Sequence, residues 1–115
     1  MTDALLPGLG VAGEAGAERE RLAMRWLELT RRVLPGMAAA QGWPICRDHC
    51  FMRVCLDNAL GRPWHEAVRR PAIRWLELHQ FRAAVAVAEG IEADPRTLPA
   101  LNDASLAWRR AARYR

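Results

Sequence analysis

The sequence predicts an all-α fold, a compact single-domain bundle of about five helices around a central apolar helix at about residues 45–60. Apolar residues recur at helical spacing in the first third of the chain. Pro and Gly divide the remainder into segments of helical length. A nearly continuous apolar run, residues 50–56, lies between Pro44 and Gly61. A helix that is apolar on almost every side is one that other helices surround.

Length and composition fit one globular domain. The chain has 115 residues, of which 51% are hydrophobic and 26% are charged. These fractions argue against disorder, and this length is close to the commonest size of a single domain. No apolar stretch approaches the roughly 18 residues of a membrane-spanning helix, so we expect no membrane contact.

The first helix is expected at about residues 17–34. Residues 1–16 are rich in Gly and Ala and are expected to form a flexible or loosely docked N-terminal arm, which leaves residues 17–115 as the helical domain. The apolar face of this helix consists of Leu22, Trp26, Leu29 and Val33. Pro35 and Gly36 follow and predict its end.

A residue typical of a helix boundary stands at each end of the expected central helix. Pro44 stands where a first helical residue tolerates the missing N–H, and Gly61 stands where a C-terminal cap belongs. A buried strand is the rival interpretation of so short an apolar run. The length between Pro44 and Gly61 favours the helix.

The remaining helices are placed by Pro and Gly. A short helix is expected at residues 63–69 and a longer one at 71–89, with a break near 76–79 and a C-terminal cap at Gly90. Asp94 followed by Pro95 predicts the start of a further short helix.

The last helix is expected at about residues 104–113. Pro99 should limit the preceding short helix to a turn or two, and Asn102 or Asp103 can cap the final one.

The sharpest candidate for chemistry is a cluster of thiols and histidines. On a helix, Cys46, His49 and Cys50 share one face, and His65 is a conceivable fourth zinc ligand. A reactive thiol and plain core packing are the other interpretations, and packing is favoured because free Cys is usually buried. No second pair of ligands is present, so we expect no metal and no cofactor.

The cysteine count also bears on the compartment. Three Cys cannot all pair within one chain, and no signal peptide is recognisable at the start. We therefore expect free thiols in a reducing, cytoplasmic setting.

All 17 basic residues are Arg, against 13 acids, which gives a formal net charge of +4. Four of these arginines fall in the last seven residues, without an acid among them: Arg109, Arg110, Arg113 and Arg115. A solvated basic end is one interpretation of this cluster. Contact with an anion or a nucleic acid is the other.

Five Trp are a high number for this length. Trp43 and Trp64 each flank a helix start beside a Pro and are candidate anchors for a partner, because Trp dominates interface hot spots.

Three functional hypotheses follow. No Gly-rich phosphate loop and no metalloprotease or hydrolase motif is present. The leading hypothesis is therefore a small helical interaction module without catalytic activity, with a protein partner or a second copy of itself. The alternatives are nucleic-acid binding through the C-terminal arginines, and thiol or metal chemistry centred on Cys50 with a distant His.

Overall fold

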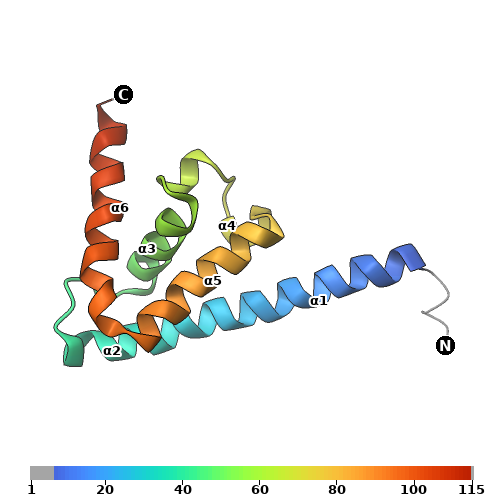
Figure 1. Cartoon of the computed structure of the whole chain (residues 1–115), viewed down its shortest axis with the longest axis horizontal. Helices are drawn as coiled ribbons and strands as arrows, with labels where there is room; N and C mark the ends of the chain where they lie inside the picture. Colours follow the sequence, from blue (N-terminus) through green and yellow to red (C-terminus); the bar gives the residue numbers. More distant parts are fainter. Residues whose placement is uncertain (1–6, 115) are drawn as a thin grey trace.

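The computed structural model describes residues 7–114, with side chains from residue 13 onward, and this part of the chain contains helices and turns but no strand. Figure 1 shows the long helix α1 (Pro7–Glu28) along one edge, with α5 (Leu78–Ala93) beside it and α6 (Leu98–Arg113) at a steep angle to both. The predicted all-α bundle is confirmed.

The helical segment that begins with α1 extends further in both directions than the sequence predicts. It begins at Pro7 rather than residue 17, and its first turns extend past the other helices (Figure 1). Residues 7–16 of the expected arm are therefore helical, whereas residues 1–6 lie outside the described residues.

The expected end of this helix at Pro35 and Gly36 is wrong. A π-helical turn (Leu29–Val33) leads directly into α2 (Leu34–Gln41), and the Leu34 N–H donates to the Leu29 carbonyl. Pro35 thereby falls in the first turn of α2, where its missing N–H is tolerated. The helix ends instead at Gly42, which has a φ of 65° and adopts the left-handed conformation.

The central helix α3 (Asp48–Leu60) confirms the main prediction. It contacts α2, the π turn, α5 and α6, and the side chains of Phe51, Val54 and Cys55 are fully buried. It begins three residues later than expected because Arg47 is extended. It ends as predicted at Gly61, where φ is 70°.

The expected helix at 63–69 is reduced to a 3₁₀ turn (Trp64–Glu66). The break predicted near 76–79 is confirmed, because α4 (Ala72–Trp75) ends at Leu76 and α5 starts at Leu78. A capping box between Glu77 and Gln80 starts α5, since each side chain accepts from the other residue's backbone N–H.

The expected cap at Gly90 is wrong, because α5 continues to Ala93. The physical reason is Ile91, which is fully buried and reaches the core only if the helix makes another turn. Asp94 follows, and its carboxylate accepts from the Arg96 N–H at the start of a 3₁₀ turn (Pro95–Thr97), as the sequence predicts.

The last helix, α6, starts at Leu98 and not near residue 104. Pro99 lies in its first turn, and Leu98 is fully buried. Asn102 is therefore inside the helix and buried, so the expected caps at Asn102 and Asp103 are wrong.

The core lies where α1, the π turn, α3 and α5 meet. Trp26 of α1 packs edge-on against Phe81 of α5, with ring centroids 6.5 Å apart. Ion pairs flank this contact on the surface, joining Arg82 to Glu18, and Arg25 to Glu89 and Glu92. None of the helices described is long and apolar enough to cross a membrane.

Because α3 is central, shortening a buried side chain on α3 should destabilise the protein more than shortening an exposed side chain on α6. Phe51→Ala should lower the free energy of unfolding by about 3–5 kcal/mol, because it leaves a cavity in a fully buried site. Leu106→Ala, at an exposed site on α6, should change it by less than about 0.5 kcal/mol. Urea unfolding followed by circular dichroism measures both, and equal losses would contradict the central placement.

Candidate functional site

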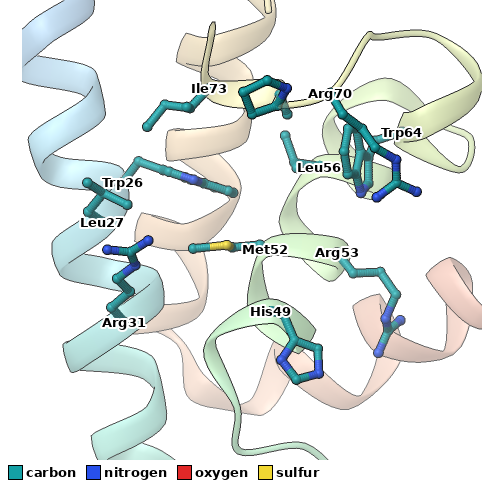
Figure 2. Close-up of a pocket in the computed structure, with 12 residues that line it drawn as sticks. Trp26, Leu27, Arg31, His49, Met52, Arg53, Leu56, Trp64, Arg70 and Ile73 are labelled. Atoms are coloured by element: carbon teal, nitrogen blue, oxygen red, sulfur yellow. The ribbon is translucent and has the colours of Figure 1, made fainter.

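A cleft of about 570 Å³ lies between α1 and α3. Figure 2 shows its two helical walls and the segment around residues 70–73 that closes one end. The lining is Trp26, Leu27, Arg31, His49, Met52, Arg53, Leu56, Trp64, Arg70, Pro71, Ala72 and Ile73. This volume lies within the range of ligand-binding pockets.

The apolar surface of the cleft comes from both walls. Met52 extends from α3 toward Trp26 of α1, and Leu56 lies one turn further along α3 (Figure 2). Met52 and Leu27 are half-buried and pack against the core at its margin. The cleft therefore lies at the edge of the hydrophobic core, where the lining side chains are only partly covered.

The closing segment is held in place by arginine contacts. One Arg19 guanidinium nitrogen donates to the carbonyls of Ile73, at 3.2 Å, and Arg74, at 2.9 Å. These bonds tie α4 to α1. At the other side of the cleft, the Arg70 guanidinium lies 5.2 Å from the centroid of the Trp64 ring, within cation–π range.

The permanently charged side chains that line the cleft are all arginines. Its lining includes Arg31, Arg53 and Arg70 together with His49, and it contains no acidic residue. The Arg53 guanidinium is engaged elsewhere, because it donates to Ser105 Oγ at 2.7 Å and to Asn102 Oδ1 at 2.8 Å. Arg31 and Arg70 form no salt bridge with any residue in the described range 7–114.

A buried carboxylate anchors the elements behind the cleft. Asp57 of α3 is fully buried, and its oxygens accept from Arg109 Nε at 2.8 Å, Arg109 Nη2 at 3.1 Å and Ser105 Oγ at 2.7 Å. The Trp64 backbone N–H also donates to it, at 2.9 Å. This one side chain joins α3 to α6 and fixes the segment that carries Trp64.

The four residues of the predicted thiol and histidine cluster differ in their surroundings. Cys46 is exposed and Cys50 half-buried, His49 lies at the cleft, and His65 lies at a different pocket beside Arg109 and Arg113. Among the described residues, no group of three or more His, Cys, Asp or Glu side chains is placed to hold a metal ion. Thiol or metal chemistry centred on Cys50 stays a prediction.

The predicted C-terminal arginines differ in their surroundings. Arg109 is bound to Asp57, whereas Arg110 and Arg113 are exposed on α6. Arg115 lies outside the described residues.

The two candidate Trp anchors have different environments. Trp43 is half-buried: its ring packs edge-on against Phe51, and its Nε1–H donates to the Pro95 carbonyl at 3.1 Å. Its polar atom is therefore already satisfied within the chain. Trp64 is also half-buried but lines the cleft.

Three residues of the site were not expected from the sequence: Asp57 and the two cleft arginines without a salt bridge, Arg31 and Arg70. A signal for Asp57 was available, because this acid directly follows the apolar run at residues 50–56, where a buried charge requires a partner. Arg31 and Arg70 carried no such signal. Their shared position depends on how α1 and the segment after α3 meet.

Comparison with known proteins finds no matching family model, no significantly similar curated protein and no significantly similar solved structure. Function is therefore argued from the geometry of the site alone.

Two arginines on one helix should differ sharply in their effect on stability. Arg109→Ala should lower the free energy of unfolding by about 3 kcal/mol or more, because it leaves the Asp57 carboxylate buried without its cation. Arg113→Ala, four residues further along α6 and exposed, should change it by less than about 0.5 kcal/mol. Chemical denaturation compares the two, and equal effects would refute the anchoring role of Asp57.

The thiols should differ in reactivity. Burial raises the pKa of the Cys55 thiol to about 12, so almost no thiolate is present at mildly alkaline pH, whereas Cys46 is exposed. In a Cys46→Ser/Cys50→Ser variant, Cys55 should react with a disulfide reagent only after denaturant is added. A Cys50→Ser/Cys55→Ala variant, which keeps Cys46, should react at once. Similar rates for the two native-state variants would contradict the burial of Cys55.

Proposed function

We propose that the protein is a non-catalytic interaction module that binds an amphipathic anion, a ligand with an apolar part and a negative charge, in the cleft between α1 and α3. The observation that carries this proposal is the combination of an apolar lining with cationic side chains and no acid. Apolar surface supplies binding free energy, and the cations select the sign of the ligand.

The composition of the lining favours binding over catalysis. The lining residues described include no Ser, Cys, Asp or Glu, so the cleft wall offers neither a hydroxyl or thiol nucleophile nor a carboxylate base. His49 is its one ordinary titratable side chain, and that side chain is 70% exposed with its Nδ1 3.6 Å from the Asp48 carboxylate. Asp48 does not line the cleft, and no carboxylate in the lining orients His49 toward a bound ligand.

The compartment expected from the sequence belongs to the same proposal. Cys46, Cys50 and Cys55 are all free in the structure. Unpaired thiols support a reducing, cytoplasmic setting.

The apolar anionic dye anilinonaphthalenesulfonate tests the cleft directly. The wild-type protein should bind it with enhanced, blue-shifted fluorescence. Met52→Trp should weaken binding about tenfold or more, because the larger side chain fills the space between α3 and α1.

Met24→Trp is the matched control, because Met24 is 74% exposed and does not line the cleft. It should bind the dye as the wild type does. If the wild type shows no saturable binding, or if both variants bind alike, the cleft is not the site.

Nucleic-acid binding by α6 is the second candidate. It is favoured by Arg110 and Arg113, which are exposed and form no salt bridge with any residue described, and by Tyr114, which is 88% exposed beside them. Arg109 does not belong to this surface, because it serves Asp57.

This candidate is tested with Arg110→Glu/Arg113→Glu and a single-stranded oligonucleotide in a gel-shift assay at low salt. The variant should lose binding that the wild type shows, and wild-type affinity should fall steeply with salt. Arg31→Glu/Arg70→Glu changes the net charge equally and is the control. Absence of any wild-type shift would refute the candidate.

A further inference from the structure

The α3 wall of the cleft has a regular shape. His49, Met52, Arg53 and Leu56 are spaced i, i+3, i+4 and i+7, so they lie along one helix face over about 10 Å of its axis. The facing wall is also helical, formed by α1 and the π turn. A groove between two helices suits a third helix whose apolar stripe has the same period.

The two available cations lie on opposite sides of this groove. Arg31 projects from the π turn after α1, and Arg70 lies across the cleft beside Trp64 (Figure 2). Arg53 does not contribute a third, because its guanidinium turns away to Asn102 and Ser105 of α6.

Within residues 7–114, no acidic side chain forms a salt bridge with either of these two arginines. Glu28 is the acid nearest to Arg31 in sequence, and hydrogen bonds from Arg32 and Arg25 hold its pKa below the ordinary value. Glu66 is the acid nearest to Arg70 in sequence, and it pairs with Arg62 at 3.3 Å. The positive charge at the cleft is therefore open to an external anion.

We propose that the cleft receives an amphipathic helix of a partner protein, with acidic side chains on both flanks of its apolar stripe. This inference rests on the function proposed above and names the class of partner. An aliphatic carboxylate has one charged end and can neutralise one of the two arginines. A helix with acids on both flanks meets Arg31 and Arg70 together while its apolar stripe covers Met52 and Leu56. Nucleic acid offers many anions but no apolar stripe for this lining.

The test uses two synthetic peptides of about sixteen residues, a length at which an isolated helix is marginally stable. Both carry Leu at i, i+3, i+4 and i+7. One has Glu on both flanks of this stripe, and the other has Lys at the same positions. Fluorescence anisotropy of each labelled peptide is measured against the full chain, at low and at physiological ionic strength.

The acidic peptide should bind the wild type about tenfold or more tightly than the Lys peptide, with an affinity that falls as salt rises. Arg31→Glu/Arg70→Glu should weaken the acidic peptide at least tenfold and improve binding of the Lys peptide. Arg110→Glu/Arg113→Glu has the same net charge and should bind like the wild type. The urea midpoints of both variants report whether each folds, and the two peptides on the wild type keep the test valid if one does not.

The outcomes separate this inference from the proposed function. If the dye binds the cleft but neither peptide does, the acidic-helix partner is refuted and the binding module stands. If dodecanoate displaces the dye and the acidic peptide does not, the cleft belongs to a small amphipathic anion. Equal binding of the two peptides would also refute the inference. If dye and peptides all fail to bind, both proposals fall.

Discussion

The buried carboxylate of Asp57 is the constraint on which the rest of the arrangement depends. It accepts hydrogen bonds from α6, through Arg109 and Ser105, and from the backbone of Trp64. A charge that is removed from water must have such partners. The positions of α6 and of the segment after α3 therefore depend on the position of α3. Arg53 strengthens the same junction by donating to Ser105 and Asn102. Polar contacts thus position one side of the bundle, whereas apolar packing builds the other.

The cleft is a consequence of these two kinds of docking. Apolar contacts join α3 to α5 and α5 to α1, as in the Trp26–Phe81 pair, while the segment that closes the cleft is held by Arg19 bonds to carbonyls at the end of α4. Two acids of α1 are paired with other arginines: Glu18 with Arg82 of α5, and Glu28 with Arg25 of α1 and Arg32 of the π turn. Arg31 and Arg70, which line the cleft, form no salt bridge with any residue described, so this edge of the core carries unpaired positive charge.

The helices that depend on a local hydrophobic pattern were predicted from the sequence. The predicted helix boundaries were wrong where the burial of a following apolar residue outweighs the tendency of Pro or Gly to end a helix. The central helix and its end at Gly61 follow from a continuous apolar run and from a position that requires positive φ. Pro35, Gly90 and Pro99 were interpreted as boundaries, yet all three lie inside helices. A following buried residue, such as Ile91, makes another helical turn more favourable than a stop. The cleft could not be predicted, because Arg31 and Arg70 meet only through tertiary contacts.

A pentapeptide that occurs twice in the chain shows what the local sequence determines and what the tertiary structure determines. Arg-Trp-Leu-Glu-Leu occurs at residues 25–29 and again at 74–78. In α1 the first copy continues as helix and buries Trp26, whereas the second spans the break between α4 and α5 and leaves Trp75 42% exposed. Composition and periodicity by themselves determined an all-helical chain with an apolar centre, because both depend on neighbours in sequence. Only the tertiary structure decided which Trp is buried and which Arg is unpaired, because burial and charge pairing depend on residues far apart in the chain.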